Sequence, residues 1–389
     1  MGSSISKKDI ARKIEQLTEA EAIVTENEMI VSIGPQHSGA GHFRIILKLD
    51  GDVIVDAIPD PGFVHRSYEK LAENMTYIHN VPLAEKPNHA DPANLVMGYV
   101  RTVEELSGIE VPERAQYIRT ILCEISRIMS HLYFFGIFGI FLNHSTMFMW
   151  ALGDRDLFAD LGQMLTGARI TYAFFLAGGV YRDIPQGFEE KTLKTLDYFE
   201  KHLKDYEKIF MDNPILQERT VGIGVLKPED AIKLGVVGPV VRGSGIKHDV
   251  RKDDPYAAYD KIDFEIPSFK EGDSYSRVMV RFRELQESVK IIRQALRDMP
   301  PGPIRNPPGR LIPRWPVKVG EYYSRAEAAR GEVGFYLVSD GTEKPYRLKM
   351  ASPSFRNMPA IPFLLRGATL ADLPAIYMSL DYWGPEADR

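Results

Sequence analysis

The chain has 389 residues, of which 44% are hydrophobic and 26% are charged, and its formal net charge is −5. A chain of this length exceeds the size that one hydrophobic core usually supports, so we expect two or three lobes. The negative net charge argues against bulk electrostatic attraction to nucleic acid, and we expect no nucleic-acid partner.

The first 91 residues divide into an arm and a β-hairpin region. Residues 1–30 predict a polar, helix-forming N-terminal arm, and no signal peptide is visible in them. Two apolar runs within residues 43–60 flank Asp50-Gly51, which predicts a β-hairpin. The region 31–91 then continues through a short helical stretch to a polar loop that holds His89.

Residues 92–300 predict a bundle of long helices with a Gly-rich insertion at 218–268. Pro112 fits the start of the first long helix. Further long helices are expected at 155–179, 187–210 and 273–298. The last of these has one apolar seam, made of Val278, Phe282, Leu285, Val289, Ile292 and Leu296.

The first long helix contains the only cysteine, Cys123, which we expect to be a small core residue. One cysteine cannot hold an iron–sulfur cluster or a zinc ion alone. Glu124, Arg127 and His131 share one face of this helix and predict a buried polar network or a contact with another subunit. The most apolar stretch, residues 132–142, is shorter than the ~20 residues that span a bilayer, so no transmembrane helix is expected.

Residues 301–389 comprise a proline-rich connector, a second β-hairpin that turns at Asp340-Gly341, and a charged tail. The elements together predict an α+β protein. Its central long-helix bundle is expected to carry small antiparallel β-hairpin regions near both ends of the sequence.

Several stretches together carry a resemblance to a known family. They read "GPQHSGAGHFRI" (34–45), "GFVHRSYEKLAEN" (62–74), "VPERAQYIRTILCEISRIMSHL" (111–132), "RGSGIKHDVRKDDPYAAYD" (242–260) and "GEVGFYLVSDGTEKPYRLK" (331–349). The chain resembles the large, D-type component shared by respiratory complex I and the membrane-bound nickel–iron hydrogenases. The resemblance implies a fold like that of the nickel–iron hydrogenase large subunit.

In hydrogenases of this family, two Cys-x-x-Cys pairs hold the metal centre. Asn88 and Asp91 stand in the places of the first pair, and Trp383 and Glu386 stand in those of the second. None of the four side chains supplies the thiolate that a low-valent nickel–iron centre requires. The comparison therefore predicts no metal site and no hydrogenase activity.

Complex I has also lost these cysteines, and there the pocket receives a quinone headgroup whose partners are a His and a Tyr. The position of that Tyr falls on His89, while His37 and His42 both lie near the position of the His. These two histidines flank a Gly-rich turn that includes Gly41, and such a turn lets backbone N–H groups approach a headgroup.

The candidate catalytic residues are His89, His42, His37, Asp91, Glu69 and Glu386, and the candidate pocket residues are Asn88, Trp383, Asp381 and Gly41. Other interpretations stay open for several of them. Asp91 could cap the helix that starts at Pro92. Glu69 is a proton carrier or a structural ion-pair partner, and Trp383 fills the former metal cavity or anchors the tail.

The connection between the last long helix and the second hairpin is short, as in the hydrogenase branch of the family. A cysteine-free member of that branch resembles the large subunit of the archaeal membrane-bound sulfane sulfur reductase. We therefore expect a subunit that helps to reduce sulfane sulfur (polysulfide). A quinone pocket of the complex I type and a non-catalytic coupling scaffold are the alternatives.

The resemblance also implies where the chain works. We expect a peripheral subunit on the cytoplasmic face of the membrane that binds no cofactor alone and receives electrons from a 4Fe-4S cluster in an adjacent subunit. The expected partners are a small iron–sulfur subunit of the complex I B type, a C-like soluble subunit, an H-like membrane anchor, antiporter-like ion-pumping subunits, and ferredoxin as electron donor.

Overall fold

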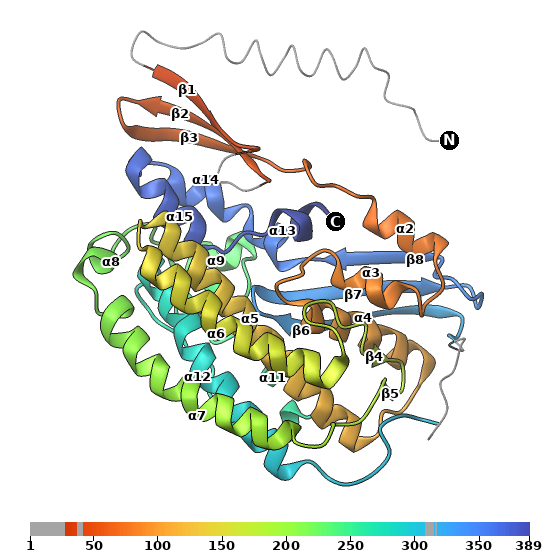
Figure 1. The fold of residues 1–389 in the computed structure, drawn as a ribbon. Helices are drawn as coiled ribbons and strands as arrows, with labels where there is room; N and C mark the ends of the chain where they lie inside the picture. Colours follow the sequence, from red (N-terminus) through yellow and green to blue (C-terminus); the bar gives the residue numbers. More distant parts are fainter. Residues whose placement is uncertain (1–27, 37–41, 308–314, 316) are drawn as a thin grey trace, which may run out of the picture.

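The computed structural model describes residues 28–36, 42–307, 315 and 317–389. Residues 1–27 of the predicted arm lie outside this range, and so do the candidate residues His37 and Gly41. Long helices lie side by side at the centre of the molecule, and two three-stranded antiparallel sheets lie at its periphery (Figure 1). The predicted α+β architecture is confirmed.

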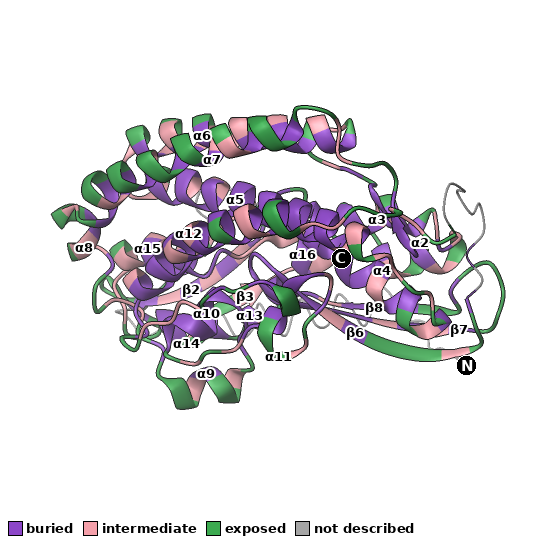
Figure 2. Ribbon diagram, turned by 90° about the horizontal axis from the view of Figure 1, so that it is seen from below, coloured by how far each residue is buried: buried purple, intermediate pink, exposed green. Residues whose placement is uncertain are grey.

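The helical centre contains α4 (Pro92–Ser107), α5 (Glu113–Phe141), α6 (Ser145–Thr166), α7 (Phe188–Tyr206) and α12 (Ser274–Asp298). Helix α5 packs against α4, α6 and α12, and most of its residues are buried. Figure 2 shows α6 and α7 as an outer layer with an exposed face above α5. Within the described residues, α5 alone is apolar and long enough to cross a membrane, but 89% of its most apolar window is buried in the protein, as in a core helix.

Three of the four long helices begin and end close to the predicted residues. The apolar seam of α12 is buried from Val278 to Leu296. The helix predicted at 155–179 is wrong at both ends, because α6 starts ten residues earlier, at Ser145, and ends at Thr166. The ring of His144 caps its first turn by accepting from Met147 N, and Gly167 ends it in the left-handed conformation, with φ of 88°.

The N-terminal sheet consists of β1 (Glu28–Ile33), β2 (Arg44–Asp50) and β3 (Val53–Asp60). The predicted hairpin turns at Asp50-Gly51, as expected, and β1 adds a strand that begins inside the predicted arm. The inner face of the N-terminal sheet includes Phe43, Ile45 and Leu47. These side chains form a second core with α14 (Ala360–Leu365) and α15 (Leu373–Ser379), so the two ends of the sequence pack together.

The second sheet consists of β6 (Gly320–Ala328), β7 (Gly331–Ser339) and β8 (Arg347–Ala351). The predicted hairpin is β7 and β8, whereas β6 was not predicted. Helix α4 covers this sheet, and Gly98 allows the close approach because a Cβ there would lie 3.1 Å from the Phe335 ring.

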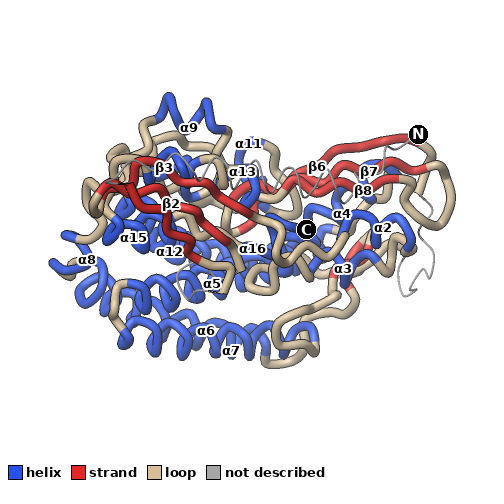
Figure 3. The backbone as a smooth tube through the Cα atoms, turned by 90° about the horizontal axis from the view of Figure 1, so that it is seen from above, coloured by secondary structure: helices blue, strands red, loops and turns tan. Residues whose placement is uncertain are grey.

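Shorter elements connect these parts. They are α2 (Tyr68–Asn74), α3 (Asn80–Glu85), β4 (Phe175–Leu176), β5 (Gly179–Val180), a π-helical turn (Glu207–Met211), α8 (Pro214–Glu218), α9 (Pro228–Leu234), α10 (Pro239–Gly243), α11 (Val250–Asp253), two 3-10 turns (Tyr259–Lys261 and Leu370–Asp372), α13 (Pro353–Asn357) and α16 (Gly384–Asp388). The Gly-rich insertion is therefore a set of short helices that includes α9, α10 and α11. Figure 3 shows the end of the chain and α16 between the N-terminal sheet and α3.

Candidate functional site

The segment after α15 is held by the loop that precedes α2. The carboxylate of Asp388 accepts hydrogen bonds from Gly62 N at 2.8 Å and from Val64 N at 3.0 Å. The ring of His65 forms a further hydrogen bond, 2.7 Å long, with the carbonyl oxygen of Asp388. Residues that are more than 300 positions apart in the sequence are thus joined by hydrogen bonds.

In hydrogenases of this family, the resemblance places one Cys-x-x-Cys pair at Asn88 and Asp91 and the other at Trp383 and Glu386. In this chain, the two segments lie against each other. Asn88 Nδ2 donates to Glu386 Oε1 at 3.4 Å, and both side chains are fully buried. The second carboxylate oxygen of Glu386 accepts from the hydroxyl and the backbone N–H of Ser354. Burial raises the pKa of Glu386.

Asp91 is equally buried, and its carboxylate serves the local structure. It accepts hydrogen bonds from Asn94 Nδ2 at 2.7 Å, Ser126 Oγ at 2.8 Å and Ala329 N at 2.6 Å. Asp91 stands at the N-cap position of α4, as predicted, but its side chain makes no capping hydrogen bond. It joins α4, α5 and the turn between β6 and β7 instead.

These residues do not fit a nickel–iron centre. Asn88, Asp91, Trp383 and Glu386 carry no thiolate, and the two carboxylates already accept hydrogen bonds from the protein. Within the part of the chain that the structure describes, no group of three His, Cys, Asp or Glu side chains is placed to hold a metal ion.

A cavity of about 340 Å³ opens beside the former cysteine segments. Helices α5 and α15, the segment that leads into α16, and two histidines line it. Its lining residues are His42, His89, Tyr133, Phe134, Ile137, Phe141, Tyr377, Met378, Asp381, Tyr382, Trp383, Gly384 and Pro385. The walls are mainly aromatic and aliphatic, with few polar groups, which is typical of a small-molecule site.

Trp383 forms the centre of one wall. Its ring meets the ring of His89 edge to face at a centroid distance of 4.9 Å, and that of Tyr133 at 5.6 Å. The guanidinium of Arg330 lies 4.9 Å from the Trp383 ring centroid, a cation–π contact. The tryptophan therefore shapes the cavity through contacts with His89, Tyr133 and Arg330.

His89 is the exposed polar group of this wall. Partial burial of this side chain, followed by the positive charges of Arg155, Arg330 and Arg66, lowers the pKa of His89. The ring is therefore neutral near pH 7, with one nitrogen able to donate and the other able to accept. A neutral imidazole among arginines can deliver a hydrogen bond to an anion without adding positive charge.

Asp381 is fixed by a two-pronged contact with Arg330. Arg330 Nη2 donates to Asp381 Oδ1 at 2.9 Å, and Arg330 Nε donates to the carbonyl oxygen of Asp381 at 3.0 Å. The backbone of Asp381 has a φ of 55°, which is uncommon for a residue with a side chain. This contact holds the turn that presents Trp383 to the cavity.

The structure thus brings together four of the predicted residues at the cavity, namely His42, His89, Asp381 and Trp383. Asn88, Asp91 and Glu386 are buried away from its lining. Glu69 lies elsewhere: it accepts from Lys349 Nζ at 2.9 Å and from Met350 N at 3.1 Å, as expected for a structural ion-pair partner.

The aromatic wall from α5 was not predicted from the sequence, and neither were Arg155 and Arg330 beside it. Tyr133, Phe134, Ile137 and Phe141 follow helical spacing, but most residues of α5 are apolar or buried, so the pattern did not single out a cavity face. Arg330 lies in the tight turn between β6 and β7, and no local motif marks it.

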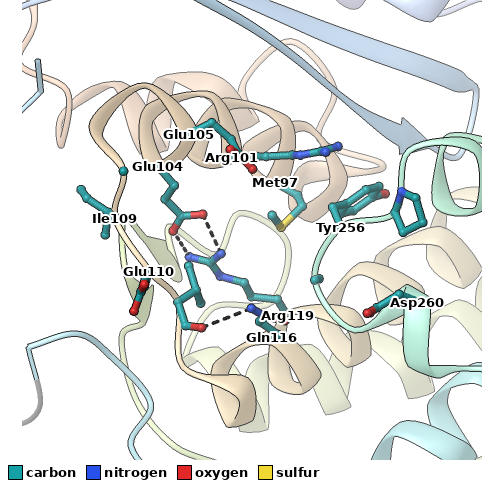
Figure 4. A pocket seen from close by; sticks show the side chains of 14 residues that line it. Met97, Arg101, Glu104, Glu105, Ile109, Glu110, Gln116, Arg119, Tyr256 and Asp260 are labelled. Carbon is teal, nitrogen blue, oxygen red and sulfur yellow. Dashed lines mark hydrogen bonds and ion pairs between the residues drawn. The ribbon is translucent and has the colours of Figure 1, made fainter.

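A second cleft, of about 600 Å³, lies between α4, α5 and residues 255–260 (Figure 4). Its buried charges pair within the protein: Arg119 donates to both oxygens of Glu104, at 2.6 and 3.0 Å. Arg101 pairs with Asp254 at 2.9 Å. No predicted site residue lines this cleft, so we place the candidate site at the aromatic cavity.

Comparisons with known proteins identify the family of the chain. The sequence profile of the family described as "Respiratory-chain NADH dehydrogenase, 49 Kd subunit" matches residues 142–316 and 310–389. The chain is 43% identical to the D subunit of the F420H2 dehydrogenase of Methanosarcina mazei over 373 residues, which cover 95% of this chain and 100% of that protein.

Two further relatives are named as D subunits of NADH-quinone oxidoreductases. The protein from Dehalococcoides mccartyi is 43% identical over 373 residues (95% of this chain, 100% of the relative). The protein from Geotalea uraniireducens is 41% identical over 384 residues (93% and 98%). Among solved structures, a chain of the archaeal membrane-bound sulfane sulfur reductase matches with a TM-score of 0.90 and 40% identity, covering 94% of this chain and 100% of that one.

Proposed function

The chain belongs to the family of the 49-kDa subunit of the respiratory-chain NADH dehydrogenase, and we propose that it is the large subunit of the electron-transfer arm of a membrane oxidoreductase complex in which its aromatic cavity receives an external electron acceptor. The acceptor that we propose first is sulfane sulfur, that is, the terminal sulfur of a polysulfide chain.

The observation that carries this proposal is a surplus of positive charge beside an apolar cavity. The Arg155 guanidinium stacks 5.9 Å from the Tyr133 ring centroid and makes no ion pair with a described residue. Its charge reaches the cavity, since it lowers the pKa of His89, whereas Arg330 is paired with Asp381 at 2.9 Å. A polysulfide is an apolar sulfur chain that carries negative charge near pH 7, so it matches both features.

The proposed reaction needs electrons and a proton at one place. Two electrons enter a sulfur–sulfur bond, which breaks into two sulfur anions, and one of these takes up a proton to leave as hydrosulfide. Donors and cations placed where this charge develops lower the barrier. Here Arg155, Arg330 and the ring of His89 would supply that stabilisation, and the aromatic walls would exclude water.

This chain has one cysteine, so the electrons must come from another subunit. We propose that an adjacent small iron–sulfur subunit supplies them from a 4Fe-4S cluster. The further partners proposed are a C-like soluble protein, a membrane anchor and ion-pumping subunits, with ferredoxin as the donor to the complex. The chain itself would be peripheral, on the cytoplasmic face, because the one helix of the described residues that is long and apolar enough to span a membrane is mostly buried.

A quinone is the second candidate acceptor, and two observations favour it. Rings from Tyr133, Phe134 and Trp383 provide flat apolar surfaces that suit a quinone headgroup. In addition, the relative from Dehalococcoides mccartyi is named as an NADH-quinone oxidoreductase subunit, and it aligns over its full length in an alignment of 373 residues. A protein named for quinone reduction therefore has a chain of similar length.

The intact membrane complex, reduced with ferredoxin, distinguishes the two acceptors. Turnover is measured with an organic trisulfide or polysulfide, by sulfide release, and with a soluble quinone, by the loss of quinone absorbance. Sulfide release without quinone turnover is the expected result. Quinone turnover without sulfide release would overturn the sulfur proposal, and turnover with neither would favour a coupling scaffold.

A further inference from the structure

The outer face of the N-terminal sheet is apolar where a solvent-facing sheet is usually polar. Its inner face packs on α14 and α15 in the second core (Figure 1), and successive residues of a strand point to opposite faces. Ile30 of β1, Ile46 of β2 and Ile58 of β3 therefore point outward, because the next or the preceding residue of each strand belongs to the second core. The sheet thus has a second apolar face.

These three isoleucines form one row across the sheet, which we call the isoleucine row. Ile46 lies directly opposite Ile58 in the strand register, and Ile30 lies one diagonal step from Ile46. Ile58 is 50% exposed and Ile30 is 36% exposed, so the row is open in the described part of the chain. A contiguous apolar patch of this kind marks a surface that another element or molecule covers.

The charged groups beside the row are paired with each other. Arg44 Nε donates to Asp60 at 2.6 Å, and Arg366 Nη2 donates to Asp56 at 2.7 Å. These pairs leave little net charge at the rim for an anionic or cationic partner. What fits this face is an element with an apolar side of its own.

The residues directly before β1 carry a matching pattern. Ser6 and Asp9 have the spacing of a capping box, which predicts a helix from Lys7 onward. Apolar side chains then recur at helical spacing, at Ile10, Ile14, Leu17 and Val24. The sequence therefore predicts an amphipathic helix that ends just before β1 begins at Glu28.

The dimensions of the two surfaces agree. A helix over residues 7–24 would be about 27 Å long, because an α-helix rises ~1.5 Å per residue. The 8 residues of β3 span about 26 Å, at ~3.3 Å per residue. Residues 25–27 are left to reverse the chain, which is a typical length for a short connection. Glu21 lies within the apolar stripe, and Lys48, next to the row, supplies an opposite charge.

We propose that residues 7–24 fold back onto the N-terminal sheet as a helix whose apolar side covers the isoleucine row. The contact stabilises β1, which within the described sheet pairs with β2 alone. Since β1 and β2 flank the segment that ends at His42, the arm also supports the side of the cavity to which His42 belongs. The inference does not rest on the proposed function.

Thiol labelling of the full chain tests the contact. The native Cys123 is buried, so a cysteine introduced on the row reports alone. Ile58→Cys is treated with a maleimide, with and without the further changes Ile14→Asp and Leu17→Asp, which place two charges on the apolar side of the arm. We expect labelling to become about tenfold faster or more when the arm carries these changes, because the covered state is then lost.

Two controls separate this contact from general effects. Gln16→Asp with Ala22→Asp adds the same two charges to the polar side of the predicted helix, and it should leave the labelling of Ile58→Cys unchanged. Ile232→Cys, a reporter on α9 at a position that is 69% exposed, should label at one rate in every arm variant. Equal labelling of Ile58→Cys with the wild-type arm and with Ile14→Asp and Leu17→Asp would overturn the proposal.

The same labelling in the assembled complex distinguishes the arm from a partner subunit. If Ile58→Cys is slow to label only in the complex, and equally slow with either arm, a partner covers the row and the proposal is wrong. Hydrogen exchange of the β1 amides gives a measurement that needs no introduced cysteine. Exchange at Glu28–Ile33 should be faster in the chain with Ile14→Asp and Leu17→Asp than in the wild type, and equal rates would also contradict the contact.

Discussion

Asn88 and Glu386, which are 298 positions apart in the sequence, form a buried hydrogen bond of 3.4 Å. In hydrogenases of this family, the resemblance places a cysteine at each of these two positions. An amide and a carboxyl now join the two segments, so a polar contact holds together the region that a metal would otherwise link.

Replacing Asn88 with Asp should make the stability of this contact strongly dependent on pH. The change places a second buried carboxyl beside Glu386, and the two must share a proton to avoid like-charge repulsion. The pKa for loss of the shared proton is then strongly raised in the folded state, so stability is kept at pH 4 and is lost as the pH rises. We expect a loss of about 2–4 kcal/mol at pH 8. Urea unfolding at the two pH values measures it.

The swapped pair gives the control for this prediction. Asn88→Asp combined with Glu386→Gln restores one amide and one carboxyl, so most of the lost stability should return. If the double variant is as unstable as Asn88→Asp alone, the two side chains do not interact as the structure indicates.

Replacing His89 with Ala should reduce turnover of the complex about a hundredfold, because positioned acid–base groups typically contribute that much. His79→Ala is the matched control, since His79 is an exposed histidine at the start of α3 that contacts Thr76 at 3.0 Å. Its turnover should remain within about twofold of the wild type. The measurement is steady-state reduction of the acceptor. Equal turnover in both variants would favour a coupling scaffold.

Glu85 should make the wild-type chain less stable at high pH. Burial raises the pKa of Glu85 to about 7, although its carboxylate accepts from Tyr172 N at 3.0 Å and Ala173 N at 2.6 Å. Because the pKa is raised in the folded state, the favourable contribution is present below the usual carboxyl pKa and is lost as the pH rises through about 7. The shift corresponds to roughly 3 kcal/mol.

Glu85→Gln should remove this dependence while keeping an oxygen that accepts both backbone hydrogen bonds. The difference in free energy of unfolding between pH 5 and pH 8 should therefore be smaller in Glu85→Gln than in the wild type. Glu105→Gln, a change at an exposed glutamate, should keep the wild-type difference. An unchanged pH dependence in Glu85→Gln would show that Glu85 ionises normally.

Local patterns in the sequence were sufficient for the main elements. The seam from Val278 to Leu296 specified α12, and Asp50-Gly51 specified the turn between β2 and β3, because helical spacing and turn chemistry act over a few residues. The end of α6 was missed, since Gly167 was read as part of a longer apolar helix. The strand β6 was missed because it follows the proline-rich connector, and its pairing with β7 is evident only in the folded chain.

The candidate site was predicted where a motif marks it and missed where tertiary packing creates it. His89, Asp381 and Trp383 follow from the places of the missing cysteines, and the resemblance brought them together. Tyr133 and Arg155 face the site only because α5 and α6 pack with a particular rotation, which their own sequence does not encode. The placement of Glu69 also depends on β8, whose Lys349 pairs with it.

Arg330 and Asp381 should show strong energetic coupling. Removing either partner leaves a buried charge unpaired, so Arg330→Met and Asp381→Asn should each destabilise the protein by about 3–5 kcal/mol. The double variant should lose clearly less than the sum, because neither member of this pair is then left facing a missing partner. We expect a coupling energy of about 2 kcal/mol or more from a double-mutant cycle measured by urea unfolding. Additive losses would mean that the contact, 2.9 Å long in the structure, contributes no specific interaction.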